Sequence, residues 1–373
     1  MKNQRNHQPT KRTALALMAA CLLAAGCGQS NANEGREVIE KPDKEITVLE
    51  NGAQAQDSAA QVQTIDELEA LRGFDWLNEE EIIVSQPNEE AEPITVEGEA
   101  RYPNHLYAYN LTTDELEPLQ ESDEEQNFAL LSPDRKHLFY KVMEEASGFP
   151  HMLDLESGES IRLMEDQLFA YEGDWADNTH VVFGTVTGQI VSADVEGNVE
   201  VLAEAGGVVS DVHRIDDRLY YQNGGVLYML ELADDGTAGE ARELMEGVDW
   251  VVPSPDGQQL AIVRQSGEAE RTLMLTDLEG NEKTSLATST QIFGTSWAPD
   301  GTRLVYNAVS ESGGDKGVFI ADAVTGQTTQ IAVDMEYAAD KIRWSPSGAR
   351  LLTAQSVETD EGYTFKTYVI TLQ

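Results

Sequence analysis

The residues best suited to chemistry stand singly along this chain of 373 residues. Beyond the N-terminal segment the histidines are His105, His137, His151, His180 and His213. A zinc site needs two histidines at a close, fixed spacing, as in H-E-x-x-H, and none of these five has such a neighbour. Because a lone histidine on a strand is typical of packing or of surface, the histidines predict neither a metal site nor a bound cofactor.

Glycine and serine motifs give no catalytic centre either. A serine hydrolase requires G-x-S-x-G, and the nearest match, Gly294 to Ala298, lacks the second glycine. Gly-Gly pairs at 206–207, 224–225 and 313–314 lack the Lys-Ser/Thr of a phosphate-binding loop, so we interpret them as turns between strands. Acidic turns such as Ala233 to Gly236 lack the D-x-D-x-D-G order of a calcium loop. The sequence therefore predicts no catalytic residue.

Cys27 is the one residue whose surroundings indicate a covalent modification. A basic head and a following apolar run give residues 1–26 the form of a secretion signal. The run, Ala14 to Ala25, is shorter than the about 20 residues of a membrane-spanning helix. The segment ending in Ala-Ala-Gly-Cys resembles the lipobox of bacterial lipoproteins, which implies cleavage between Gly26 and Cys27 and acylation of Cys27, palmitate included. An ordinary signal peptide with an incidental Cys27 is the alternative.

Composition limits the partners of this chain. It holds 67 acidic and 25 basic residues, for a net charge of −42. Such a protein repels nucleic acid and anionic membrane surfaces, because phosphate binding needs clustered Lys and Arg. Acidic runs such as Glu121 to Glu125 are typical of solvated loops, and a surface that recruits divalent cations or a basic partner is the alternative. We therefore expect no nucleic-acid partner and a membrane reached through the lipid on Cys27, on the extracytoplasmic face.

Between the signal and the folded domain the chain is polar. Residues 27–63 are rich in Asn, Glu, Gln and Lys, and bury too little apolar surface to order themselves, so we predict a flexible tether. Thr64 begins a capping-box pattern and Gly73 supplies a stop, which together predict a short helix. The folded domain is expected to comprise residues 64–373.

From residue 74 onward the chain repeats one unit. Each copy has an aromatic or apolar residue, a turn rich in Pro, Asp and Gly, and then a short apolar strand. The residues at the proline-equivalent position are Asn78, Pro133, Asp177, Ile215, Pro255, Pro299 and Pro346, at steps of 55, 44, 38, 40, 44 and 47 residues. Most of these steps fit the about 40 to 50 residues of a four-stranded propeller blade.

The clearest copies, Ser296 to Gly301 and Arg343 to Gly348, read Trp-Ala-Pro-Asp-Gly and Trp-Ser-Pro-Ser-Gly within. Over residues 74–373 this pattern resembles the PD40 (WD40-like) repeats of TolB-like β-propellers. A lipoprotein of this layout also resembles the YqgU-like propeller lipoproteins of the cell envelope. The resemblance implies an all-β propeller of four-stranded blades, and it implies no activity, because propellers host many unrelated functions.

Seven copies predict seven blades, with six and eight left open because the first step is long and the fourth copy is weak. The last unit offers three strands before the chain ends, and an open edge there would expose unpaired backbone groups. We therefore predict that an upstream strand, near Glu45 to Leu49 or Ala60 to Thr64, completes the last blade and closes the ring.

Tryptophan recurs at one place in the repeat. Trp76, Trp175, Trp297 and Trp344 stand two residues before the proline-equivalent position, and Trp250 is near it. A residue that recurs in this way most simply packs between neighbouring blades, although aromatic side chains that line a ligand site would be the alternative.

Two hypotheses of function follow from these observations. The first is a non-catalytic binding or scaffold module for a protein, a peptide or another envelope component. The second is a propeller enzyme, a hydrolase or lyase, whose carboxylates gather at the central channel from several blades and leave no linear motif. Three or more carboxylates or histidines around a cavity would favour the second hypothesis or a metal site, and calcium in the channel stays open. The sequence favours the first.

Overall fold

The computed structural model of the chain describes residues 36–41, 44–49, 60–96, 98–144, 147–169, 173–310, 316–332, 340–359 and 362–373. The chain divides into two units, Met1–Glu34 and Gly35–Gln373, and every described residue belongs to the second. Its described residues form strands, turns and loops without a helix, so none of them builds a helix that could span a membrane. The signal segment 1–26 and Cys27 lie outside the described residues.

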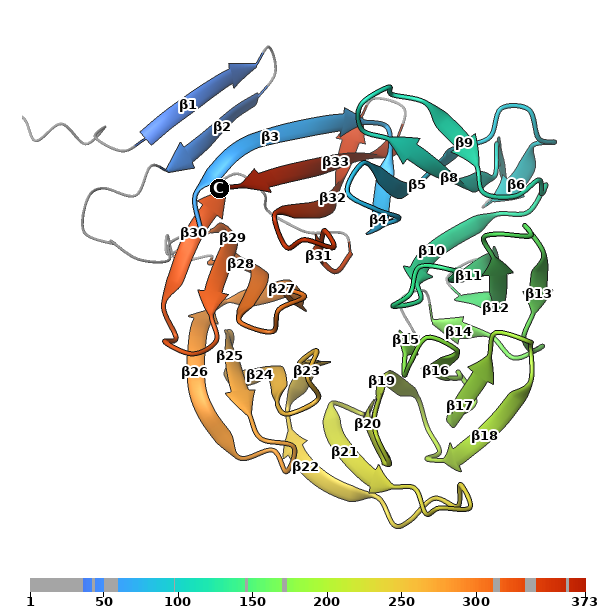
Figure 1. The fold of residues 1–373 in the computed structure, drawn as a ribbon, viewed down its shortest axis with the longest axis vertical. Helices are drawn as coiled ribbons and strands as arrows, with labels where there is room; N and C mark the ends of the chain where they lie inside the picture. The colour runs from blue at the N-terminus through green and yellow to red at the C-terminus, as the bar shows by residue number, and fades with distance from the viewer. Residues whose placement is uncertain are drawn as a thin grey trace, which may run out of the picture. The chain divides into compact units, whose positions relative to one another are not determined.

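Seven four-stranded antiparallel sheets follow one another around a central axis (Figure 1). Blades 1 and 2 comprise β4 (Arg72–Trp76), β5 (Glu81–Pro87), β8 (Asn104–Asn110), β9 (Leu116–Pro118), and β10 (Gln126–Leu131), β11 (His137–Glu144), β12 (Ser147–Asp154), β13 (Ser160–Arg162), with β14 (Leu168–Phe169) paired to β12. Blades 3 and 4 comprise β15 (Asp174–Trp175), β16 (His180–Gly184), β17 (Gln189–Asp194), β18 (Val199–Glu204), and β19 (Val209–Ile215), β20 (Arg218–Asn223), β21 (Val226–Glu231), β22 (Arg242–Glu246).

The remaining blades complete the ring. Blades 5 and 6 comprise β23 (Val248–Pro253), β24 (Leu260–Gly267), β25 (Glu270–Thr276), β26 (Glu282–Ser289), and β27 (Gln291–Trp297), β28 (Arg303–Val309), β29 (Gly317–Asp322), β30 (Thr328–Ala332). Blade 7 comprises β31 (Arg343–Trp344), β32 (Arg350–Thr359), β33 (Gly362–Leu372) and β3 (Val62–Glu69). The predicted all-β propeller of seven four-stranded blades is confirmed.

Strand β3 closes the ring from the N-terminal side. It pairs antiparallel with β33, from Val62 opposite Leu372 to Glu69 opposite Lys366. The expected upstream strand therefore comes from the second of the two predicted segments. The helix predicted to begin at Thr64 is wrong, because the unpaired edge of β33 offers a full ladder of backbone hydrogen bonds, which outweighs the about 1 kcal/mol of a helix cap.

Two further hairpins stand outside the blades. The other segment considered for closure lies in β2 (Lys44–Leu49), which pairs with β1 (Arg36–Lys41) within the range predicted as tether. An inserted hairpin, β6 (Ile94–Val96) and β7 (Glu99–Arg101), lies between β5 and β8 and accounts for the long first step of the repeat. The weak fourth copy is a complete blade.

The apolar core lies between the blades. Within the described residues seven buried clusters occur, one at each contact between neighbouring blades. At the closure, for example, Trp76 and Ile82 of blade 1 pack with Leu352 and Val369 of blade 7. Burial of apolar surface between each pair of blades stabilises the ring, at about 25 cal/mol per Å² removed from water.

Four tryptophans join neighbouring blades in one repeated way. Each indole N–H donates to a backbone carbonyl of the preceding blade: Trp76 to Arg343 at 3.2 Å, Trp175 to Leu130 at 3.0 Å, Trp297 to Val252 at 3.0 Å and Trp344 to Ser296 at 3.4 Å. Packing between blades is confirmed for these four. It is wrong for Trp250, which stands three residues before the tryptophan-equivalent position of its blade, Pro253, and is 40% exposed.

Candidate binding site in the central channel

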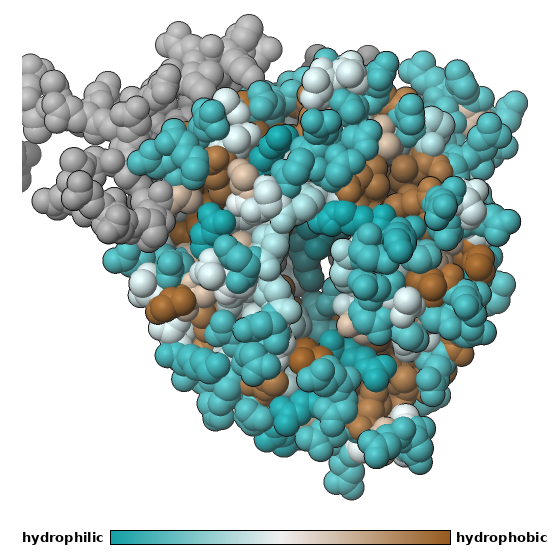
Figure 2. Space-filling model, in the orientation of Figure 1, coloured by the Kyte–Doolittle hydropathy of each residue, from teal (hydrophilic) through white to brown (hydrophobic). Residues whose placement is uncertain are grey.

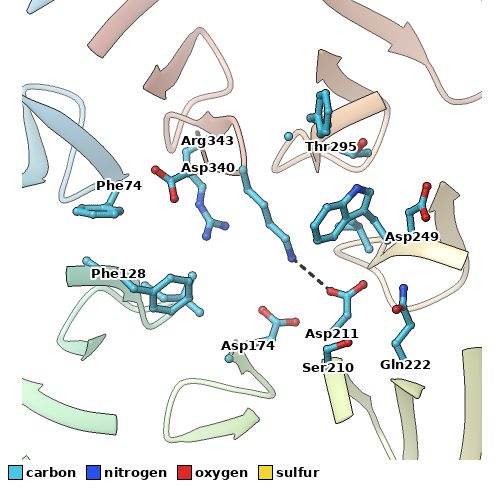
Figure 3. A pocket seen from close by; sticks show the side chains of 18 residues that line it. Phe74, Phe128, Asp174, Ser210, Asp211, Gln222, Asp249, Thr295, Asp340 and Arg343 are labelled. Atoms are coloured by element: carbon cyan, nitrogen blue, oxygen red, sulfur yellow. Dashed lines mark ion pairs between the residues drawn. The ribbon is translucent and has the colours of Figure 1, made fainter. Parts of the chain in front are cut away.

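Residues from all seven blades line one cavity of about 470 Å³ in the central channel, which Figure 2 shows as an opening in the middle of the ring. We call this cavity the channel pocket. Its lining consists of Phe74, Phe128, Ala129, Leu130, Gly173, Asp174, Ser210, Asp211, Gln222, Asp249, Trp250, Val252, Phe293, Gly294, Thr295, Asp340, Lys341 and Arg343 (Figure 3). A ring of blades brings together residues that are far apart in the sequence.

β-Bulges in the innermost strands aim side chains at the channel pocket. In five blades the register with the second strand breaks, between Gly73 and Asp75, Asn127 and Ala129, Ser210 and His213, Val248 and Trp250, and Phe293 and Ser296. Of the residues skipped at these breaks, those that line the pocket are Phe74, Phe128, Asp211, Asp249, Gly294 and Thr295. A bulge bends its strand and redirects a side chain, and bulges are common beside functional sites.

Two of the bulge residues hold a strained backbone. Phe128 and Asp211 have φ of 53° and 52°, in the left-handed region. At the equivalent bulge of blade 6 the residue is a glycine, Gly294, with φ of 62°. This region costs a residue that has a Cβ atom about 1–2 kcal/mol, and a bulky residue such as phenylalanine is an outlier there. Glycine would avoid the cost. Strained residues cluster at functional sites, so two in one pocket make it the candidate site of this chain.

His213 joins the carboxylates of two blades. Its Nδ1 lies 2.5 Å from Asp174 Oδ2, and its Nε2 lies 3.1 Å from Asp211 Oδ1. Asp211 Oδ2 accepts the backbone N–H of Val251 in blade 5 at 2.6 Å. From blade 7, Lys341 Nζ lies 3.9 Å from Asp211 Oδ1. We call these four side chains and the Val251 amide the His213 cluster.

The charges of the His213 cluster are fixed near neutral pH. Burial alone would lower the pKa of His213, but the adjacent carboxylates of Asp174 and Asp211 outweigh burial and raise its pKa to about 9. Burial would raise the pKa of both carboxyl groups, yet His213 and Lys341 hold those pKa values below the usual one. The cluster therefore holds an imidazolium between two carboxylates. An imidazole that is protonated at neutral pH is a poor general base.

The other two carboxylates of the channel pocket also have cationic partners. Asp340 accepts from Arg72 Nε and Nη2, each at 2.8 Å, and Arg72 Nη1 donates to Asn127 at 3.2 Å. Asp249 accepts from Nε of Arg271. All four lining carboxylates are thus paired with cations.

Three polar atoms around the channel pocket are buried without a hydrogen-bond partner in the described part of the chain. They are Gln222 Nε2, Thr295 Oγ1 and Arg343 Nε, from blades 4, 6 and 7. Gln222 is 8% exposed and Thr295 is 4% exposed. An unsatisfied buried donor costs about 1–3 kcal/mol, so native proteins seldom keep one where no ligand or water completes it. Figure 3 shows these three residues around the same cavity.

Aromatic side chains form an apolar wall beside these donors. Phe74 and Phe128 contribute from blades 1 and 2, and Trp250 and Phe293 from blades 5 and 6. Trp250 remains 40% exposed, an unusual exposure for a large apolar side chain that lines a concave site. An apolar wall with a few convergent polar groups is the usual composition of a ligand pocket.

The residues weighed from the sequence have different outcomes. Gly294, in the rejected serine motif, lines the channel pocket as a bulge residue and not as part of a nucleophile turn. The pair 224–225 is the turn between β20 and β21, as interpreted, and 313–314 lies outside the described residues. Among the described residues no group of three or more His, Cys, Asp and Glu is arranged to hold a metal ion.

His213 joins two lining carboxylates of the channel pocket, a position that the sequence did not reveal. It was interpreted as packing or surface because its partner Asp174 is 39 residues away on another blade. Two other histidines illustrate the expected roles. His151 is buried against Tyr140 at a ring distance of 5.2 Å, and His180, the first residue of β16, is exposed beside Asp177.

Comparison with known proteins supports the fold. The profile of a family described as the lipoprotein LpqB beta-propeller domain matches residues 235–358, about a third of the chain. No curated protein is significantly similar in sequence. This partial match agrees with a β-propeller lipoprotein.

Three solved structures are similar to this chain over most of their length. An oligogalacturonate lyase in complex with manganese aligns with a TM-score of 0.59 and 14% identity, covering 91% of this chain and 96% of that one. The oligogalacturonate lyase of Vibrio parahaemolyticus gives 0.58 and 14%, covering 90% and 96%. A chain of the mitotic checkpoint complex gives 0.55 and 17%, covering 85% and 98%. At such identities these likenesses establish that the chain folds as a β-propeller, and nothing about its ligand.

Proposed function

We propose that this chain is an exported β-propeller lipoprotein, anchored through Cys27 to the extracytoplasmic face of the cell membrane. Its channel pocket binds a ligand or a partner segment without converting it. The TolB-like and YqgU-like lipoproteins that its repeats resemble, and the partial match to a lipoprotein propeller domain, support the anchored layout. The observation that carries the binding role is the group of unpartnered buried donors beside an exposed tryptophan in one cavity.

The protonation states in the channel pocket support binding over catalysis. Four carboxylates do surround the cavity, as the enzyme hypothesis expected. A general acid needs a pKa near the working pH, however, and a nucleophile needs an adjacent base. Here cations hold the pKa of Asp174 and of Asp211 low, and His213 is already protonated. The likeness to oligogalacturonate lyases is one of fold at 14% identity and brings no activity to this chain.

In-cell photocrosslinking tests the proposed binding role. A benzophenone amino acid replaces Trp250 in the channel pocket, and in a matched variant it replaces Val324, which is 85% exposed on an outer turn. We expect one defined adduct from position 250 that is absent from position 324. Identical patterns of adducts from both positions, or none from position 250 in any growth condition, would contradict the proposal.

Fractionation tests the anchor separately. The full chain should sediment with membranes, and a chain whose residues 1–27 are replaced by a secretion signal that is cleaved without lipidation should appear in the soluble extracytoplasmic fraction. A cleaved chain of this kind that stays with membranes would show that the lipid on Cys27 is not the anchor, and would leave the crosslinking result unaffected.

A further inference from the structure

The balance of charge in the channel pocket differs from that of the whole chain. The protein as a whole has a net charge of −42. The charged groups that line the pocket or pair directly with its lining are the carboxylates Asp174, Asp211, Asp249 and Asp340 and the cations Arg72, His213, Arg271, Lys341 and Arg343. Each carboxylate has a cationic partner, and the guanidinium of Arg343 makes no ion pair with any described residue. Among the described residues, the unbalanced charge around this pocket is thus positive.

The hydrogen-bonding groups without a partner around the channel pocket also favour an anionic ligand. Arg343 Nε and Gln222 Nε2 can only donate, and the hydroxyl of Thr295 can donate. Arg343 and Gln222 can therefore be completed only by acceptor atoms of a ligand, whereas the Thr295 hydroxyl can also accept a hydrogen bond. A carboxylate offers several acceptor sites on two oxygens, and it forms charge-assisted hydrogen bonds with a guanidinium.

The apolar lining of the pocket favours a ligand that has an apolar portion beside its acceptor atoms. Trp250, Phe128 and Phe74 provide an apolar surface beside the donors, and Leu130 and Val252 extend it. A volume of about 470 Å³ accommodates a small ligand or a terminal residue, within the about 300–1,000 Å³ typical of ligand pockets. A strongly hydrated inorganic anion would leave this wall unfilled, whereas an apolar body attached to the carboxylate would cover it.

We propose that the channel pocket recognises a carboxylate carried on an apolar body, with Arg343 and Lys341 holding the carboxylate and Trp250 and Phe128 contacting the body. This inference rests on the proposed binding role of the channel pocket and adds the chemical class of its ligand. The same chemistry is offered by a free organic acid and by the C-terminal residue of a peptide.

Calorimetric titration of the full mature chain tests the ligand class. The probes are N-acetylphenylalanine and its neutral amide, together with Gly-Gly-Phe bearing a free or an amidated C-terminus. We expect each acid to bind tighter than its amide by roughly tenfold or more, the usual size of a hydrogen bond to a charged group. Tighter binding of the tripeptide would assign the peptide source, and tighter binding of the acetylated amino acid the free acid.

Variants identify the residue responsible. Arg343→Gln should abolish the preference for acid over amide, and Arg343→Lys should retain part of it. Arg218→Gln removes a charge of blade 4 that pairs with Glu279 of blade 5 and lies outside the lining, and it should leave the preference unchanged. An unchanged thermal unfolding curve would show that Arg343→Gln folds like the wild type. If that variant does not fold, the preference for acid over amide is measured on Arg343→Lys instead.

Two outcomes would overturn the inference. Equal affinity of acid and amide would show that the pocket binds its ligand without recognising a carboxylate, and the proposed binding role would stand. Binding of none of the four probes at millimolar concentration would reject this ligand class, while the adduct from position 250 would still decide the binding role.

Discussion

Lys341 and Asp211 form an ion pair within the channel pocket, with Lys341 Nζ 3.9 Å from Asp211 Oδ1. Lys341 precedes the first strand of blade 7 and Asp211 lies in the first strand of blade 4, so the pair joins blades that are not neighbours in the ring. The apolar clusters, in contrast, join only adjacent blades. A distance of 3.9 Å makes this a loose pair, and a carboxylate that enters the channel pocket would compete with Asp211 for the same ammonium group.

Removing the imidazolium should destabilise the propeller. His213→Gln leaves the carboxylates of Asp174 and Asp211 close together without the charge between them. Loss of one partner from a buried ion pair costs about 3–5 kcal/mol. Because the Asp174 side chain is 36% exposed, we expect a smaller loss of unfolding free energy, about 2–3 kcal/mol, in urea denaturation.

The matched control for this variant is His180→Gln. His180 also pairs with an aspartate, Asp177 at 3.1 Å, but its side chain is 44% exposed. Its loss should change the unfolding free energy by less than about 0.5 kcal/mol. Equal effects of the two substitutions would show that the His213 cluster contributes no more than a surface pair.

The His213 cluster should also make stability depend on pH. The folded state raises the pKa of His213 from 6.5 to about 9, so its contribution is fully present below pH 6.5 and is lost as the pH rises through 9. The lowered pKa values of Asp174 and Asp211 give a contribution that is present above about pH 4 and is lost below it. The difference in melting temperature between the wild type and His213→Gln should therefore shrink between pH 6.5 and 9. A constant difference over that range would contradict the assigned protonation state.

The backbone strain at Phe128 predicts that a glycine variant is more stable there than an alanine variant, the reverse of the usual order. In a strand interior glycine is ordinarily less stable than alanine by about 0.5–1 kcal/mol. At φ of 53° alanine retains the steric cost and glycine removes it, so Phe128→Gly should be more stable than Phe128→Ala by about 1 kcal/mol. The same pair of variants at Val212, whose φ is not positive, should show the ordinary order. Ordinary order at both positions would mean that the bulge at Phe128 is not strained.

Replacing a tryptophan between blades should lower stability, whereas replacing Trp250 in the channel pocket should weaken ligand binding. Trp297→Phe loses the 3.0 Å hydrogen bond to the Val252 carbonyl between blades 5 and 6, and should cost about 1–2 kcal/mol in chemical denaturation. Trp250→Phe, at a site that is 40% exposed, should change stability by less than about 0.5 kcal/mol and should weaken ligand binding. A large stability loss at position 250 would return Trp250 to the structural role expected from the sequence.

Much of the fold could be predicted because every blade repeats the same solution. The Pro-Asp-Gly turn before β24 and β28 and the tryptophans before their turns recur at blade spacing. The weak fourth copy shows the limit of such a pattern. In that blade Arg214 pairs with Leu219 and so occupies the tryptophan-equivalent position. The proline-equivalent position is therefore Asp216, one residue after the Ile215 that the sequence pattern predicts.

The channel pocket could not be predicted in this way, because it consists of what differs between blades. Three residues before the tryptophan-equivalent position, the six blades described at that position present Gly73, Phe128, Asp211, Trp250, Gly294 and Lys341 in order. Five of these residues line the pocket: Phe128, Asp211, Trp250, Gly294 and Lys341. Variation at one position of an otherwise regular repeat was therefore the signal in the sequence, but only the ring shows that this position faces the channel.

Fluorine NMR of the protein labelled with 5-fluorotryptophan tests the binding role most directly. The five tryptophans give one reporter in the channel pocket, Trp250, and four between blades, and Trp250→Phe assigns the first signal. On addition of the soluble extracytoplasmic fraction of the producing cells, the account predicts that the Trp250 resonance shifts and the other four do not. A Trp250 resonance that stays unchanged, while binding is detected by another method or the interblade signals move, would contradict the channel pocket as the binding site.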